Sequence, residues 1–163
     1  LNSSGASVFA IEVEEPSNYG VVEFDLKGKV VSIEEKPRNP KSKYAIPGIY
    51  YYDNSVVKYA KMVKPSQRGE KEITDLNKIY LKNKLLKVNK LPRGITWLDT
   101  GTPENFYEAS EFVRVVQKRT YKKIACIEEV AYRMNYINKD DLQSLIKEKG
   151  KNDYSDYLKG LYE

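Results

Sequence analysis

The sequence predicts an α/β domain followed by a small helical appendage. Extended apolar segments alternate with helical patterns from residue 8 to about residue 119, and only helical patterns follow from 121 to 163. The 163 residues are 40% hydrophobic and 31% charged, which is typical of a water-soluble folded chain. We therefore expect a domain over residues 1–120 and an appendage over residues 121–163.

The first part of the chain is extended. Apolar residues over 8–13 predict a buried strand. The apolar segments 21–25 and 30–35 flank the turn residues 26–29, which is the pattern of a β-hairpin. A basic loop rich in turn residues follows at 36–41, at the end of the hairpin.

A run of tyrosine and aliphatic residues at 44–52 predicts the next strand. Pro47 and Gly48 interrupt this run, which indicates a bulge or a sheet edge at that point. Asp53 or Asn54 can then cap a first helix, because both side chains accept hydrogen bonds from free amides at a helix start.

Apolar residues at helical spacing over 73–81 predict a second helix. The segments 85–91 and 94–98 return to extended patterns and predict two further strands. Thr102, followed by proline and glutamate, marks the start of a helix that reaches about residue 119.

The composition excludes several kinds of site. The chain has no histidine and one cysteine, Cys126, which excludes Ser-His-Asp triads, zinc-hydrolase chemistry and an internal disulfide. We expect Cys126 to pack in a core. No apolar run approaches the roughly 20 residues that a membrane span needs, so we expect a cytoplasmic protein without a membrane partner. The net charge of +5 is spread along the chain, so no nucleic-acid partner is expected.

Four residues of the first domain can contact a ligand. Gly20 lets a ligand approach the backbone, or it only enters the hairpin. Glu35 can accept hydrogen bonds from sugar hydroxyls and Lys36 can hold a phosphate, or the two form a solvated strand end with an internal Glu-Lys pair. Arg68 in a glycine-containing loop can hold a second phosphate, oriented by Glu70, or it is an ordinary surface residue.

Asp99 follows an apolar segment and precedes a helix start. A carboxylate there can hold Mg²⁺, which takes one or two carboxylates and completes its octahedron with phosphates and waters. The alternative is that Asp99 or Thr102 caps the helix.

Four segments together resemble the glucose-1-phosphate thymidylyltransferases: 19–24, 32–37, 68–75 and 97–102, in this order and spacing. The tail at 123–133 is similar to the helical C-terminus of the short bacterial and archaeal enzymes, so the resemblance covers nearly the whole chain. It implies a Rossmann-like mixed α/β domain. It also implies a Mg²⁺-dependent reaction in which dTTP and glucose 1-phosphate give dTDP-glucose and pyrophosphate, in the service of deoxyhexose synthesis.

The resemblance also implies the roles of individual residues. Lys36 and Asp99 are expected to be catalytic, Asp99 as a metal ligand. Ile46 stands where the family often has valine, and Arg68 is expected to make a second phosphate contact. The residues expected to contact the sugar phosphate or the sugar nucleotide are Gly20, Glu35, Lys36, Ile46 and Arg68.

The sequence departs from the family at its start. The family's glycine-rich loop that binds the nucleoside triphosphate, and a further metal-binding aspartate, are not found before Val8. We therefore expect a partial Rossmann-like nucleotidyltransferase fold that is inactive alone and forms a homo-oligomer when complete. Two alternatives stay open: a sugar-1-phosphate nucleotidyltransferase that uses UTP, CTP or ATP, and a non-catalytic truncated or assembly fragment.

Overall fold

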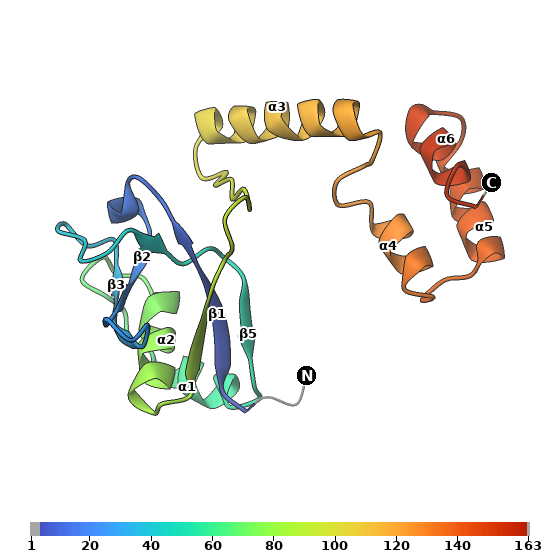
Figure 1. Ribbon diagram of the computed structural model, residues 1–163. Coiled ribbons are helices and arrows are strands. Elements are labelled where there is room, and N and C mark those ends of the chain that lie inside the picture. Colours follow the sequence, from blue (N-terminus) through green and yellow to red (C-terminus); the bar gives the residue numbers. More distant parts are fainter. Residues whose placement is uncertain (1–3, 163) are drawn as a thin grey trace. The chain divides into compact units, whose positions relative to one another are not determined.

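The computed structural model describes residues 4–162. The chain divides into two compact units, Leu1–Trp97 and Leu98–Glu163 (Figure 1). The units part before helix α3 (Pro103–Thr120), whereas the boundary drawn from the sequence at residue 120 lies after it. Helix α3 buries one residue, Ala109, so little apolar packing ties it to a core. The boundary at 120 stays a prediction.

The first unit is built on a mixed six-stranded sheet. The strand order is β3-β2-β4-β1-β5, and β6 pairs with β1 in parallel while the other pairs are antiparallel. This confirms the predicted α/β class with a mixed sheet. The strands are β1 (Ala6–Glu12), β2 (Gly20–Phe24), β3 (Val30–Glu35), β4 (Tyr44–Ala45), β5 (Tyr50–Tyr52) and β6 (Leu86–Lys90), with a short 3₁₀ helix, η1 (Pro16–Asn18), before β2.

Strand β1 is central because neighbours pair along both of its edges. Val8 lies opposite Tyr50 of β5 and Val88 of β6. The side chains of Val8 and Ala10 are fully buried, in one core cluster with Val22 of β2. Alternate side chains of a strand point to the same face of the sheet, and this face of β1 packs in the core, which explains the apolar residues at these positions.

The strand predicted over 44–52 is interrupted where the sequence indicates a bulge. Ala45 lies opposite Ile11 and Tyr50 lies opposite Val8, so the four residues 46–49 face only two residues of β1. The extra residues leave the β1 ladder, and the amide of Ile46 donates instead to the carbonyl of Gly20 at 2.8 Å. The bulge thereby ties the start of β2 to the sheet centre.

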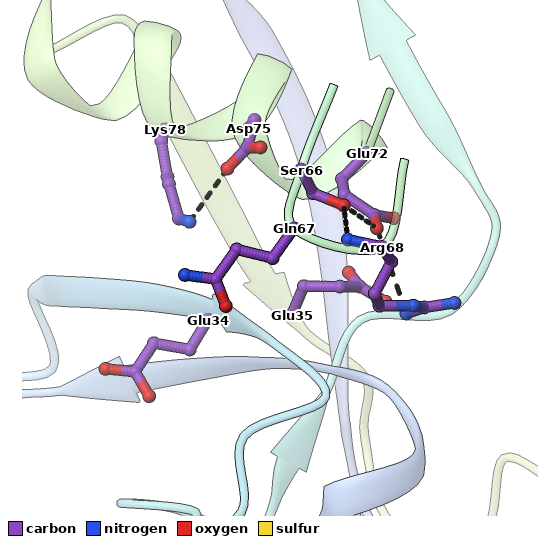
Figure 2. Close-up of a pocket in the computed structure, with 8 residues that line it drawn as sticks. All are labelled: Glu34, Glu35, Ser66, Gln67, Arg68, Glu72, Asp75 and Lys78. Carbon is purple, nitrogen blue, oxygen red and sulfur yellow. Dashed lines mark hydrogen bonds and ion pairs between the residues drawn. The ribbon is translucent and has the colours of Figure 1, made fainter. Parts of the chain in front are cut away.

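Two helices complete the first unit: α1 (Val56–Met62) and α2 (Ile73–Lys82). The buried face of α2 includes Leu76 and Tyr80, and Tyr80 contacts the rings of Tyr52 and Tyr59 at centroid distances of 5.4 and 4.9 Å. Several of the many tyrosines therefore serve packing. The first turn of α2 lies near the end of β3 (Figures 1 and 2).

The strand predicted over 94–98 is wrong. Extended pairing ends at Leu91, whose amide donates to the carbonyl of Ala10 at 2.8 Å. Pro92 has no amide hydrogen to continue the ladder, and Gly94 turns the chain with a φ of +95°. An apolar sequence without a neighbouring strand to pair with does not become a strand.

The second unit is helical, as predicted. Its helices are α3, α4 (Ile127–Arg133), α5 (Lys139–Lys149) and α6 (Asp153–Lys159). Cys126 is 3% exposed and packs with Leu142, Ile146 and Leu158, which confirms that it is a core residue. Among residues 4–162, no helix is both long and apolar enough to cross a membrane.

Acidification is expected to destabilise this helical unit. The hydroxyls of Tyr154 and Tyr157 donate to the carboxylates of Glu128 and Glu129. The Tyr157 hydrogen bond lowers the pKa of Glu129. Burial raises the pKa of Glu128, but the hydrogen bonds from Tyr154 and Lys149 outweigh it and the net shift is downward.

Because both folded-state pKa values lie below the ordinary glutamate value of 4.5, the stabilisation is present above about pH 4.5 and is lost as the pH falls further. Thermal unfolding followed by circular dichroism from about pH 7 to about pH 3 measures this loss. The variant Tyr157→Phe should show a smaller loss. A loss of the same size in Tyr157→Phe would contradict the assignment to Glu129.

Candidate functional site

An open cleft of about 410 Å³ lies in the first unit. It is bounded by the end of β3, by the loop at 66–70 and by the first turn of α2 (Figure 2). The loop at 66–70 runs over the surface, which leaves its backbone and charged side chains accessible to a ligand. The lining residues are Glu34, Glu35, Ser66, Gln67, Arg68, Glu72, Asp75 and Lys78.

Glu35, Gly20 and Thr74 meet at one edge of this cleft. Glu35 is the last residue of β3 and lies opposite Gly20, the first residue of β2. The Thr74 hydroxyl, from the first turn of α2, donates a hydrogen bond to Glu35 Oε2. A Cβ at position 20 would lie 3.0 Å from Thr74 Oγ1 and 3.3 Å from Glu35 Oε2. Position 20 therefore needs glycine so that these two polar groups can approach the backbone.

Lys36 follows directly after β3. Its amide donates to the carbonyl of Tyr19 at 3.0 Å, which extends the hairpin by one residue, and its φ is +41°. A left-handed conformation is uncommon for a residue with a side chain, and such residues concentrate at functional sites. No ion pair of the described residues involves Lys36, and the nearby Glu34 pairs with Lys41 at 3.6 Å. The Lys36 ammonium is exposed and can meet an anion.

Ile46 reaches this region through its backbone. The hydrogen bond from its amide to Gly20 anchors the start of β2, while its side chain is 7% exposed and packs in the core with Ile33. A change between isoleucine and valine at this position alters core volume by one methylene and leaves the backbone contact in place.

Arg68 projects from a closed loop. The amide of Ser66 donates to the carbonyl of Glu70 at 2.8 Å, and Gly69 turns the chain with a φ of +79°. Arg68 Nη2 lies 3.2 Å from Glu70 Oε2, and Arg68 Nη1 lies 3.8 Å from Glu72 Oε1. Two carboxylates thus orient the guanidinium at the cleft, as the sequence suggested for Glu70. The Arg68–Glu70 pair is solvent-exposed and is therefore weak enough for a phosphate to replace Glu70.

Charges of both signs line the cleft, and most of them are paired. Lys78 bonds Asp75 at 2.8 Å, and Ser66 Oγ donates to Glu72 Oε1 at 2.9 Å. Burial, and then the negative charge of Glu35, raise the pKa of Tyr50. The Tyr50 hydroxyl thus lies close enough to Glu35 for the carboxylate charge to act on it.

Sequence reasoning did not select Thr74 or Tyr50 as members of this region. One signal for Thr74 was available, since a threonine falls on the apolar face of the predicted helix over 73–81. The patterns gave no information on which strand end would face it. Tyr50 is one of fourteen tyrosines, and nothing in the sequence distinguishes it from those that pack in the core.

Asp99 belongs to the second unit, in the segment before α3. Its Oδ2 accepts a hydrogen bond from Asn105 Nδ2 at 3.4 Å. Thr102 is the residue that caps α3, through its Oγ1 and the amide of Asn105 at 3.1 Å. The capping alternative is thus fulfilled by Thr102, and the half-buried Asp99 carboxylate keeps lone pairs for another partner.

The residues present offer a divalent cation few protein ligands. Within residues 4–162, no group of three or more acidic or cysteine side chains gathers closely enough to hold a metal ion. One carboxylate such as Asp99 suits Mg²⁺ only if substrate phosphates and waters supply the other ligands, which is the usual arrangement for this ion. Asp99 therefore fits as a single ligand.

The structure therefore connects four of the predicted residues through the β2–β3 hairpin and the bulge: Gly20, Glu35, Lys36 and Ile46. Arg68 lines the same cleft as Glu35. Their roles in binding and catalysis, and that of Asp99, stay predictions. An anionic ligand with hydroxyl groups would find a cation at Lys36 and Arg68 and a hydrogen-bond acceptor at Glu35.

Comparison with known proteins gives consistent matches. The sequence profile described as "Nucleotidyl transferase" matches residues 2–115. A glucose-1-phosphate thymidylyltransferase from Neisseria meningitidis is 49% identical over 94% of this chain, and one from Mycolicibacterium smegmatis is 50% identical over 95%. The chain spans 54% of the length of each of these relatives.

Solved structures agree with the fold. A Bacillus anthracis protein assigned as a glucose-1-phosphate thymidylyltransferase, in complex with sucrose, superposes with a TM-score of 0.61 and 43% identity. That match covers 68% of this chain and 44% of the other. A UDP-glucose pyrophosphorylase complexed with UDP-glucose superposes with a TM-score of 0.58 and 28% identity, over 66% of this chain and 43% of the other.

Proposed function

The chain belongs to the nucleotidyl transferase family, and from that premise we propose that it serves glucose-1-phosphate thymidylyl transfer by holding the sugar phosphate in the cleft of its first unit. In this reaction a phosphate oxygen of glucose 1-phosphate attacks the α-phosphorus of dTTP. The bond from that phosphorus to the bridging oxygen breaks, and pyrophosphate leaves with dTDP-glucose as the other product. The relatives named for this activity span nearly the whole of this chain and support the choice of substrates.

One observation carries the proposal: Lys36, which forms no ion pair within residues 4–162, directly follows an oriented carboxylate at the end of β3. Thr74 fixes one oxygen of Glu35, which leaves the other oxygen to accept hydrogen bonds from sugar hydroxyls. Lys36, the next residue, is exposed, and its ammonium can bind the phosphate. A sugar phosphate can use both groups, because its phosphate is bonded to the sugar ring.

Nucleotidyl transfer of this kind needs no general base, which agrees with a chain that has no histidine. The attacking phosphate oxygen is already an anion, so the difficulty lies in bringing two anions together. Lys36 and Arg68 offset the negative charge of the sugar phosphate, and Glu35 orients the ring. We propose Asp99 as one oxygen ligand of Mg²⁺. When bound, that ion neutralises charge on the nucleotide phosphates.

The test is pyrophosphate release by the protein in the form in which the cell makes it. We expect release that requires dTTP, Mg²⁺ and glucose 1-phosphate together, and that is slower when UTP, CTP or ATP replaces dTTP. Release without glucose 1-phosphate, or a preference for another nucleotide, would contradict the proposal.

We also propose that a second copy of the chain covers the outer face of α4. Ile127 and Val130 of this helix and Met134, which directly follows it, are 74%, 55% and 56% exposed and fall on one helical face. Its glutamates Glu128 and Glu129 turn inward to α6 instead. An apolar stripe that faces water while charges face the core is typical of a helix with a partner.

We expect the variant Val130→Glu to shift the protein toward monomer, because the new carboxylate would be buried in the interface without a partner. Light scattering after size-exclusion chromatography measures the mass. The variant Gln143→Glu, which adds the same charge on exposed α5, should leave the oligomer intact. A monomeric wild-type protein would contradict the homo-oligomer.

A further inference from the structure

A line of polar side chains connects α2 to the sheet. Thr74, Asn77 and Tyr80 recur every third residue on the buried face of this helix, and they are 2%, 1% and 0% exposed. We call these three residues the polar line of α2. Each bonds a partner at a different place. Thr74 donates to Glu35 at the end of β3. Asn77 Oδ1 accepts from the Tyr52 hydroxyl of β5 at 2.6 Å, and the Tyr80 hydroxyl donates to Asp53 Oδ1 at 3.1 Å.

The central residue of the polar line is an inefficient way to stabilise a core. Asn77 Nδ2 is buried and has no hydrogen-bond partner among the described residues. A buried donor without a partner is destabilising, whereas apolar groups of the same shape in place of both partners are often neutral or better. Stability alone therefore does not explain an asparagine at this position.

Hydrogen bonds in the polar line restrict how α2 can lie. An apolar helix face tolerates small slides and rotations, but a hydrogen bond weakens steeply when its angle or length changes. The Tyr52–Asn77 bond lies one helical turn from Thr74. Any slide of α2 that breaks it would also move Thr74, and with Thr74 the oxygen of Glu35 that it fixes.

We propose that Asn77 is a positioning residue for the sugar-phosphate site: through Tyr52 it fixes the place of α2 on the sheet and so holds Thr74 against Glu35. Tyr50 supports this arrangement. Its ring stacks on that of Tyr52, with the centroids 6.1 Å apart and an interplanar angle of 12°, and the charge of Glu35 raises the pKa of its hydroxyl. The choice of ligand rests on the proposed function, whereas the register of α2 does not.

The test compares stability with affinity in one double variant, Tyr52→Phe with Asn77→Leu. Removing both partners leaves no orphaned hydroxyl, so we expect the unfolding midpoint to stay at or above the wild-type value. Calorimetry of glucose 1-phosphate binding should show an affinity about tenfold lower, which corresponds to about 1.4 kcal/mol. A residue that only stabilised the fold would not separate these two quantities.

The matched control is Tyr51→Phe with Asn89→Leu. It makes the same two exchanges in β5 and β6, outside the polar line, where Asn89 Nδ2 bonds the carbonyl of Val8 at 3.3 Å. Its affinity for glucose 1-phosphate should equal that of the wild type. Equal loss in both double variants would mean that the loss is not specific to the polar line and would overturn the inference.

Three other outcomes would overturn the positioning role of Asn77. Wild-type affinity in the Tyr52→Phe, Asn77→Leu variant would overturn the positioning role and leave the proposed function standing. A lowered unfolding midpoint together with lowered affinity would make the pair a stabilising contact and overturn the inference. Absence of binding by the wild-type chain would overturn the proposed function and, with it, the positioning role.

Discussion

Replacing Lys36 by alanine is expected to weaken glucose 1-phosphate binding by about 100-fold, because hydrogen bonds to charged groups contribute about 1.5–3 kcal/mol. The ammonium of Lys36 is unpaired among the described residues and follows directly after Glu35, so its loss leaves the phosphate without its nearest cation. In thymidylyl transfer we expect turnover to fall by a similar factor of about 100, since the same charge offsets the repulsion between the two anionic substrates.

The matched control for this change is Lys41→Ala. Lys41 lies in the same loop and pairs with Glu34 at the surface, so its removal should leave affinity nearly unchanged. A third variant separates charge from backbone conformation. Lys36→Gly should be at least as stable as Lys36→Ala, because the φ of +41° favours glycine, yet it should bind as weakly. Calorimetry and thermal unfolding measure both quantities, and wild-type affinity in Lys36→Ala would remove this residue from the site.

The second large effect is expected at Gly20. A Cβ there would lie 3.0 Å from Thr74 Oγ1 and 3.3 Å from Glu35 Oε2, both tighter than ordinary contacts. Because both neighbours are polar side-chain ends, the added methyl group of Gly20→Ala should displace them rather than unfold the strand. We expect Gly20→Ala to lower glucose 1-phosphate affinity by about tenfold, and the bulkier Gly20→Val to lower it further.

Gly48→Ala is the control for the glycine exchange. Gly48 lies in the bulge next to the same strands, and a Cβ there has no atom within 4 Å. Its affinity should match that of the wild type. If Gly20→Ala bound glucose 1-phosphate as tightly as Gly48→Ala does, the contact between Gly20, Glu35 and Thr74 would have no role in binding.

Much of the first unit could be predicted because its signals are local. The hairpin follows from two apolar segments around a turn, and the bulge follows from Pro47 and Gly48, since proline cannot donate to a ladder. The segment 94–98 was misassigned for a related reason. Its apolar pattern matches that of a strand, but a strand also needs a neighbouring strand to pair with. The spacing of apolar residues along the sequence does not show whether such a neighbour is present.

The contacts that shape the site could be predicted less well, because they join residues far apart in the chain. Thr74 and Glu35 are 39 positions apart, and nothing in either segment indicates that they meet. Helix α4 shows a different failure. Its apolar residues Ile127 and Val130 were recognised as helical but are exposed. Glu128, by contrast, is 7% exposed and bonds Tyr154 and Lys149. A charged side chain can be buried in place of an apolar one when hydrogen bonds and ion pairs compensate its charge. The spacing of residues along a helix does not show whether such partners are present.

Binding of a sugar 1-phosphate at the end of β3 and the start of β2 can be followed residue by residue. The measurement is nuclear magnetic resonance of the ¹⁵N-labelled chain, titrated with glucose 1-phosphate. We predict that the amides of Gly20, Lys36 and Ile46 shift together with one dissociation constant, and that glucose or inorganic phosphate alone shifts them less. Saturable shifts confined to other residues, or no shift at any concentration, would contradict binding at these strand ends.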